Sequence, residues 1–182
     1  MRMIPPTAPA AAAAGAAAST FWYPKPGDFL TGEMAKTLLD QAGLPPLEDG
    51  EALLFHGTTP DAAAAIAKGR FQLSQAKKSS LAGAGFYFAE CCCKSDEYTG
   101  EGVNGRCAIL VVRVFLGRVY KCATVKVQHA DVQAAKDSGC TALLLDREQA
   151  RGTYREFVTF DGKQCLPHFI VWYKRAPKSA AT

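Results

Sequence analysis

The stretch TYREFVTFDGKQCLPHFIVWY, from Thr153 to Tyr173, contains two β-strand patterns in succession. Both EFVTF and HFIVWY are rich in β-branched and aromatic residues, which are typical of strands. The connection DGKQCLP begins with Asp161-Gly162, a dipeptide that favours a hairpin turn. We therefore expect strands that pair late in the chain.

Glu156 stands on an apolar face of the first of these strands. Side chains alternate between the two faces of a strand, so Glu156 shares its face with Val158 and Phe160. Burying an unpaired carboxylate costs several kcal/mol or raises its pKa. Such a residue usually has a partner or a task.

The composition is that of an ordinary folded domain. The 182 residues are 48% apolar and 21% charged, which excludes a disordered or fibrous chain and leaves no room for two enzymatic domains. The net charge of +4 comes from scattered basic residues, so nucleic-acid binding is not indicated. No apolar run approaches the roughly twenty residues of a membrane span.

The seven cysteines do not form a recognisable framework. Their odd number and the length of the chain argue against a secreted, disulfide-bonded protein and favour a reducing compartment. Cys91, Cys92 and Cys93 are consecutive, yet no CxxC pair accompanies them. We interpret them as structural or incidental thiols, with a metal or redox site as the alternative.

The chain divides by composition. Residues 1–19 are low-complexity Pro/Ala sequence and predict a disordered tail, with an organellar or secretory address as the alternative. Residues 20–50 predict an N-terminal extension packed on the domain, residues 51–176 form the main domain, and 177–182 are a short C-terminal tail.

Helices and strands alternate in the first half of the main domain. In the extension, TGEMAKTLLDQAG predicts a helix capped by Thr31 and stopped by Gly43. The strand ALLF is followed by a helix with Thr59 as N-cap, Pro60 first and Gly69 as terminator. The sequence then predicts a loop in GRFQLSQAKKSSLAGAG, a strand in GFYFA, and a helix in ECCCKSDEY closed by Gly100.

The later segments complete the expected sheet. RCAILVVRVFLG is apolar enough to lie in the middle of a sheet. From Tyr120 to Gly152 only HADVQAAKDSG suggests an element, a helix. The order β–α–β–α–β followed by late strands predicts an α+β fold with a mixed or antiparallel sheet, not a doubly wound one.

Four residues, in or next to these elements, could carry chemistry. His56 follows a strand and precedes Gly57, whose missing Cβ permits close approach to the backbone. Tyr87 and Tyr98 are separated by ten residues, and a strand-helix reversal could bring their rings face to face around a flat heteroaromatic ring. Taken singly, His56 is better explained as a capping or core histidine, and the two tyrosines as core or surface residues.

Together these motifs resemble a known family. The segments LFHGT, GAGFYFAE with KSDEY, and YREFVTF with QCLPHFIVWY resemble the catalytic domain of the poly(ADP-ribose) polymerases, the diphtheria-toxin-like ADP-ribosyltransferases, over residues 51–174. The tankyrase branch is the nearest in appearance. The resemblance implies the split-sheet fold of that family, with short flanking helices.

The resemblance also implies residue roles around an NAD⁺ substrate. His56 would bind the adenine-side ribose, the backbone of Gly57 and the Ser95 hydroxyl would hold the nicotinamide carboxamide, and Thr58 would lie near a ribose. Tyr87 and Tyr98 would sandwich the nicotinamide ring. Glu156 would complete the catalytic set of His56, Tyr87 and Glu156.

The match is incomplete in ways that limit the prediction. The interval TGEGVNGRC is too short for the zinc insertion of the tankyrase branch, so no metal is predicted. Residues 20–50 cannot hold a regulatory helical domain, which makes a DNA-damage-gated enzyme a poor fit. Glutamate at 156 is compatible with polymer formation, without deciding between single and repeated transfer.

The predicted function is therefore NAD⁺-dependent transfer of ADP-ribose to a protein acceptor, including the chain itself, in the cytoplasm or nucleus. Three alternatives stay open at this stage: a catalytically idle NAD⁺-binding sensor, an NAD⁺ glycohydrolase, and a tRNA 2′-phosphotransferase. The last would need a site rich in arginine and histidine and a basic surface, neither of which the sequence suggests. Acceptor residue, oligomeric state and trigger are not indicated.

Overall fold

The protein is built on one eight-stranded sheet, as the computed structural model shows for residues 21–76, 79–122, 129–146 and 154–176. The tails predicted at 1–19 and 177–182 lie outside these described residues. The strands are β1 Phe21–Trp22, β2 Glu51–Thr58, β3 Phe86–Ala89, β4 Arg106–Phe115, β5 Val119–Cys122, β6 Ala142–Leu145, β7 Glu156–Thr159 and β8 Cys165–Lys174.

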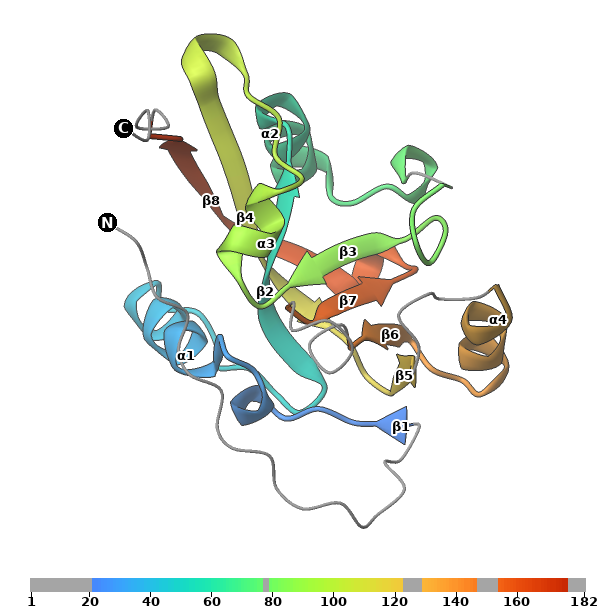
Figure 1. Cartoon of the computed structure of the whole chain (residues 1–182). Helices are drawn as coiled ribbons and strands as arrows, with labels where there is room; N and C mark the ends of the chain where they lie inside the picture. The colour runs from blue at the N-terminus through green and yellow to red at the C-terminus, as the bar shows by residue number, and fades with distance from the viewer. Residues whose placement is uncertain (1–20, 77–78, 123–128, 147–153, 177–182) are drawn as a thin grey trace, which may run out of the picture.

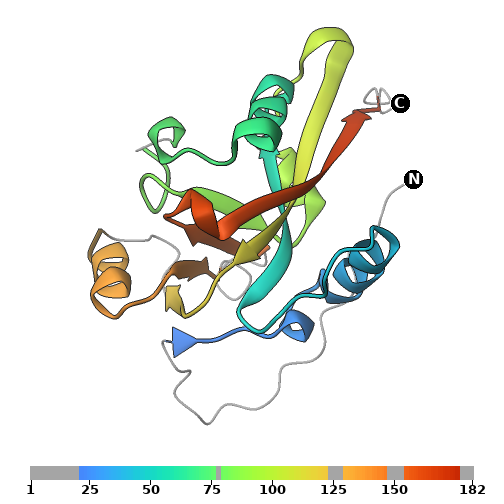
Figure 2. The same cartoon turned by 180° about the vertical axis from the view of Figure 1, so that it is seen from behind.

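The strand order is β1-β5-β6-β7-β3-β2-β4-β8, and the pairs are antiparallel except for β5 with β6. Two halves of this sheet meet at the pairing of β2 with β3, where the register gives Phe55 opposite Ala89 alone. The long strands β2, β4 and β8 form one half, and the short strands form the other (Figures 1 and 2). The α+β class and the mixed, mostly antiparallel sheet are confirmed.

Four α-helices flank the sheet: α1 Gly32–Gln41, α2 Pro60–Gly69, α3 Cys92–Asp96 and α4 His129–Asp137. Four short 3-10 turns join the elements: η1 Pro26–Asp28, η2 Leu73–Gln75, η3 Val103–Gly105 and η4 Gly162–Gln164. α2 begins as predicted, because the Thr59 hydroxyl accepts a hydrogen bond from the Ala62 N–H at 3.3 Å. It ends one residue later than predicted, since Arg70 and not Gly69 has the positive φ, +69°.

α1 covers the face of the sheet that carries Leu53 and Val111. Its Leu39 is buried, and Met34 and Leu38 pack against the cluster that contains Leu53 and Val111. Thr31 holds the N-cap position, but its side chain makes no capping hydrogen bond. Gly43 follows the helix with φ +64°, a conformation that favours glycine. The boundary near residue 50 between extension and domain stays a prediction.

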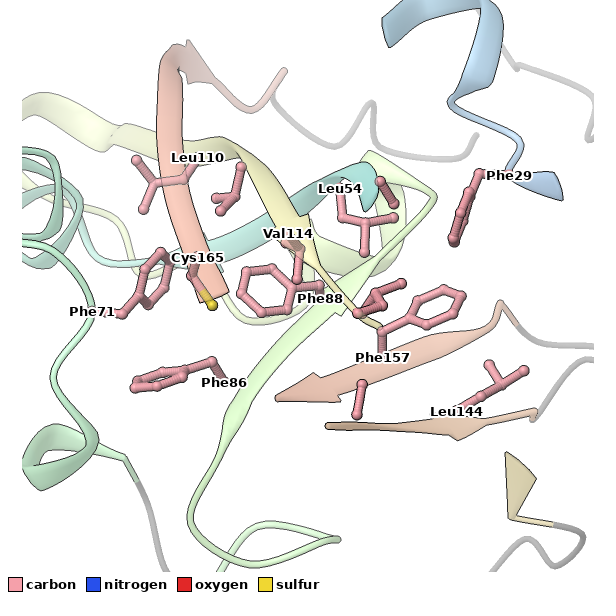
Figure 3. Close-up of a cluster of buried hydrophobic side chains, with 14 of the residues drawn as sticks. Phe29, Leu54, Phe71, Phe86, Phe88, Leu110, Val114, Leu144, Phe157 and Cys165 are labelled. Carbon is pink, nitrogen blue, oxygen red and sulfur yellow. The ribbon is translucent and has the colours of Figure 1, made fainter. Parts of the chain in front are cut away.

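A phenylalanine-rich core fills the opposite face. β4 lies between β2 and β8 and is buried from Cys107 to Val112, which confirms that its apolar run belongs in the middle of the sheet. Phe71 packs edge-on against Phe88 with 5.6 Å between ring centroids. Figure 3 shows this layer of rings continuing from Phe71 to Phe157 and Phe29.

The predicted hairpin between the last two strands is wrong. β7 pairs with β3 and β6, whereas β8 pairs with β4 in the other half of the sheet. Both edges of β7 are therefore occupied, and the chain must cross to reach a free edge. Asp161 accepts from the Lys163 N–H and starts η4, and Gly162 is needed because a Cβ there would lie 2.2 Å from the Phe71 carbonyl oxygen.

Candidate active site

A cavity of about 860 Å³ opens where the two halves of the sheet diverge. Its walls come from the ends of β2, β3 and β7, from α2, from α3 and the residues just after it, and from the loop before β3. A concave site of this size, apolar with a few polar groups, suits a small-molecule ligand. All predicted site residues line it: His56, Gly57, Thr58, Tyr87, Ser95, Tyr98 and Glu156.

His56 is held in one orientation and one tautomer. Its Nδ1 lies 2.8 Å from the carbonyl oxygen of Tyr87, and because a carbonyl can only accept, Nδ1 carries the proton. Burial lowers the pKa of His56 by more than the hydrogen bond to the Tyr87 carbonyl raises it, so the ring is neutral. Nε2 is therefore a hydrogen-bond acceptor. The rings of Phe71 and Phe88 pack beside the imidazole.

Gly57 is required by packing between β2 and α3. A Cβ at this position would lie 1.8 Å from the backbone oxygen of Ser95. The sequence analysis explained this glycine by the close approach of a ligand to the backbone. In the structure, its missing side chain instead makes room for α3, which brings Ser95 to the cavity. Ser95 itself is buried, with 3% of its surface exposed. Thr58, at the end of β2, lines the cavity beside them.

Tyr87 is fixed by two hydrogen bonds from its hydroxyl group. The oxygen accepts from the Ala82 N–H at 2.7 Å and the hydroxyl donates to the Gly83 carbonyl at 3.0 Å. Burial raises the pKa of Tyr87, and the charge of Glu156 adds to this effect, so the phenol stays protonated. These bonds tie the ring to the loop that precedes β3.

Tyr98 and Glu156 meet across the cavity. Tyr98 is 56% exposed, and its hydroxyl donates to Oε1 of Glu156 at 3.2 Å. Burial and the Glu156 charge raise the pKa of Tyr98. Glu156 is only 4% exposed, on the strand face that buries Val158 and packs Phe160, as predicted. The carboxylate on this apolar face thus has a partner, and it borders a cavity.

Lys94 is a neighbour of this pair that the sequence analysis did not single out. Its Nζ lies 5.0 Å from the centre of the Tyr98 ring and forms an ion pair with Glu97. Burial lowers the pKa of Lys94, but the Glu97 hydrogen bond and the Glu156 charge outweigh it and raise the pKa. The i, i+4 spacing of Lys94 and Tyr98 on a helical turn was the available signal.

The cysteines make no metal cluster in the described part of the chain, where no group of three or more ligand-type side chains could hold an ion. All seven are free thiols. The neighbouring thiols, Cys91 first, raise the pKa of Cys93 to about 11. Among the described residues, no helix is long and apolar enough to cross a bilayer.

Comparison with known families identifies the fold. The model of the poly(ADP-ribose) polymerase catalytic domain matches residues 34–175. This segment runs from α1 to the end of β8 and contains every residue named above as lining the cavity. The chain therefore belongs to the poly(ADP-ribose) polymerase catalytic-domain family, a family of ADP-ribosyltransferases that typically use NAD⁺.

Proposed function

We propose that this protein is an NAD⁺-dependent ADP-ribosyltransferase that cleaves the nicotinamide–ribose bond and transfers ADP-ribose to a protein acceptor. The observation that carries the proposal is the buried carboxylate of Glu156, which is hydrogen-bonded to Tyr98 and lines the same cavity as the neutral His56. Membership of the family supports it independently.

The cavity residues suit the parts of NAD⁺ in a consistent way. Nε2 of His56 is an acceptor and would take a hydrogen bond from a hydroxyl of the adenine-side ribose, with Thr58 near a ribose. Tyr87 and Tyr98 would stack on the nicotinamide ring, and the carboxamide would bond to the Gly57 backbone and the Ser95 hydroxyl. NAD⁺ is the substrate in this proposal, and no metal takes part.

Glu156 would act on the bond that breaks. Loss of nicotinamide develops positive charge at the anomeric carbon, as in glycoside hydrolysis. A fixed carboxylate beside the ribose, bonded to its 2′-hydroxyl, stabilises that charge more in the transition state than in the ground state. The burial of Glu156, of which 4% is exposed, strengthens the interaction because solvent screens a buried charge less. Since nicotinamide leaves as a neutral molecule from a cationic substrate, no general acid is needed.

Some finer features belong to the same proposal. We place the chain nearest the tankyrase branch on the strength of GAGFYFAE and KSDEY, without that branch's zinc insertion. Glu156 is compatible with extension of a polymer as well as with single transfer, so the mass added to the protein distinguishes one ADP-ribose unit from a ladder of units. The seven free thiols support a reducing compartment, cytoplasm or nucleus. The acceptor is a protein, and the chain itself is the first candidate.

Glu156→Gln tests the proposal. The variant should bind NAD⁺ within several-fold of the wild type but release nicotinamide at least about a hundredfold more slowly, the scale of one lost transition-state contact. Mass spectrometry of the protein after incubation with NAD⁺ follows nicotinamide release and added mass together. Glu33→Gln, on the outer part of α1, is the control and should transfer normally.

Each outcome separates the functions. Glu156-dependent release with added mass establishes the transferase. Release without added mass on any protein, in the presence of cell extract, means that water is the acceptor and that the protein is a glycohydrolase. Binding without release by either protein means a nucleotide sensor. Release that survives Glu156→Gln removes Glu156 from the mechanism.

A further inference from the structure

Arg155 and Glu90 face each other at the end of the ladder that carries Glu156. Ala89 and Glu156 are the last residue pair of β3 and β7, so Glu90 and Arg155 are opposite each other one step further out. Side chains alternate along a strand, which puts Glu156 on one face and Arg155 on the other. Arg155 is thus adjacent in sequence to Glu156 and lies on the opposite face.

The two side chains form a bidentate ion pair. Nε of Arg155 donates to Oε2 of Glu90 at 2.6 Å, and a terminal nitrogen donates to Oε1 at 2.7 Å. The Glu90 side chain is 1% exposed and that of Arg155 is 20% exposed. Two parallel hydrogen bonds fix the orientation of the guanidinium plane as well as its distance.

The N-terminal segment closes the outer side of this pair. The Leu30 N–H donates to Oε1 of Glu90 at 2.8 Å, and Arg155 donates to the Asp28 carbonyl at 3.0 Å. The guanidinium carbon lies 5.8 Å from the ring centre of Trp22 and 5.8 Å from that of Phe157. These contacts join β7 to residues that precede the segment matched by the family model, 34–175.

The same segment also packs on β7 through aromatic rings. Phe29 lies 5.5 Å from Phe157, ring centre to ring centre, and Figure 3 shows the two side chains next to each other. Trp22 packs on both of them, at 5.7 Å from Phe29 and 6.4 Å from Phe157. Arg155 and Phe157, the two residues that flank Glu156 in sequence, are therefore both packed against the N-terminal segment.

This support matters because Glu156 is the first residue of β7. The ladders with β3 and β6 restrain the backbone from Glu156 onward. Arg155 precedes the strand, and its side chain holds it in place. A displacement of about 1 Å in a reacting group can cost about a hundredfold in rate. We infer that the Arg155–Glu90 pair positions the catalytic carboxylate of Glu156, and that residues 22–30 belong to the support of the active site. The inference rests on the proposed function for the role of Glu156 and not for the geometry.

Arg155→Lys tests the positioning role. Lysine keeps the positive charge but cannot make the two parallel hydrogen bonds to Glu90, so Glu156 is held less firmly. We expect kcat for nicotinamide release to fall at least about tenfold, while KM for NAD⁺ and the Kd of benzamide, which mimics nicotinamide, stay within about threefold. A purely structural role would lower the melting temperature without this split between kcat and KM.

Arg113→Lys is the matched control. Arg113 forms an ion pair with Glu51; the Arg113 side chain is 14% exposed and the Glu51 side chain 19% exposed. Arg113 also donates hydrogen bonds to the carbonyls of Pro45 and Pro46. It too ties an N-terminal connection to the sheet, but at β2 and β4, and it does not line the cavity. We expect Arg113→Lys to lower the melting temperature and to leave kcat within about twofold of the wild type.

Amide hydrogen exchange provides a readout that does not depend on turnover. In Arg155→Lys, a peptide covering residues 154–159 should exchange at least about threefold faster, because the start of β7 opens more often. The same peptide should be unchanged in Arg113→Lys. If Arg155→Lys does not fold, Glu90→Gln, which keeps the shape of the buried side chain, takes its place with the same expectations.

The two readouts separate the inference from the proposed function. If the wild type releases no nicotinamide, the proposed function fails, and faster exchange at 154–159 still establishes that the pair fixes Glu156. Unchanged exchange there overturns the inference, whatever the activity. An active wild type with equal kcat values for Arg155→Lys and Arg113→Lys also overturns it.

Discussion

At the scale of single residues, His56 combines burial with a fixed tautomer. Burial lowers its folded-state pKa below the ordinary value of 6.5, while the unfolded chain keeps that ordinary value. As the pH falls through about 6.5, the unfolded state takes up a proton that the folded state does not, so stability is lost on acidification. The contribution of neutral His56 to the unfolding free energy is fully present above pH 6.5, and it is lost as the pH falls towards the folded-state pKa.

His56→Gln should therefore flatten the acid side of the stability profile. Between pH 7.5 and 5.5 we expect the variant to lose less unfolding free energy than the wild type, by no more than the limit of about 1.4 kcal/mol per pH unit for one proton. Urea titrations at pH 7.5, 6.5 and 5.5 measure it. His168, whose pKa burial and Arg113 also lower, contributes equally in both proteins.

His129 provides the control for this experiment. It is exposed at the start of α4, so His129→Gln makes the same substitution at a site away from the cavity. Parallel profiles for His56→Gln and the wild type would mean that His56 does not stay neutral on folding. The Nδ1–H group would still donate to the Tyr87 carbonyl in that case, because a charged imidazole ring also carries a proton on Nδ1.

At the scale of elements, β2 and α3 can pack closely only because residue 57 of β2 is a glycine and has no Cβ. Gly57→Ala would place a Cβ 1.8 Å from the Ser95 oxygen, which is backbone and cannot rotate away. We expect a loss of about 1 to 3 kcal/mol in unfolding free energy and weaker NAD⁺ binding, because α3 must move outward with Ser95 and Tyr98. Urea unfolding and calorimetric titration with NAD⁺ measure the two effects.

Gly27→Ala is the corresponding control, since a Cβ there meets no atom within 4 Å. Its stability should stay within about 0.5 kcal/mol of the wild type. A stable Gly57→Ala variant with unchanged NAD⁺ affinity would show that α3 can shift without disturbing the cavity.

The elements also mark where sequence reasoning succeeds. The N-cap of α2 and the apolar run of β4 could be predicted, because both depend on local chemistry. β6 was missed because its four residues are buried on both faces, which removes the alternation that identifies a strand. The hairpin was wrong because the pairing of β7 depends on β3 and β6, partners that no local pattern specifies.

The candidate site divides in the same way. His56, Tyr87 and Glu156 could be found from motif order, and the structure brings them to one cavity. The Arg155–Glu90 pair spans 65 positions in sequence and has no motif, so only the folded chain reveals it. Gly57 was singled out correctly but for a different reason, because the element that packs against it lies 38 positions later.

At the scale of the whole molecule, the cavity lies across the junction of the two half-sheets. His56 belongs to β2, whereas Tyr87 and Glu156 belong to β3 and β7, and the strands meet at the single pair Phe55 and Ala89. A ligand that contacts residues of both half-sheets would add contacts across this junction and so stabilise the folded state. Binding to the folded state alone raises stability by an amount set by ligand concentration and Kd.

Benzamide offered at about a hundred times its Kd should therefore raise the melting temperature by roughly 5 to 10 °C, which corresponds to about 2.7 kcal/mol for a domain of this size. Tyr98→Ala removes one face of the proposed ring slot and should reduce the shift at the same benzamide concentration by at least half. Differential scanning fluorimetry measures the melting temperature of each protein with and without benzamide. Trp172→Ala is the control, because Trp172 is also a partly exposed aromatic residue but does not line the cavity, and its shift should equal that of the wild type. Equal shifts in all three proteins would mean that the flat ring binds elsewhere, and the nicotinamide slot would have to be moved away from Tyr98.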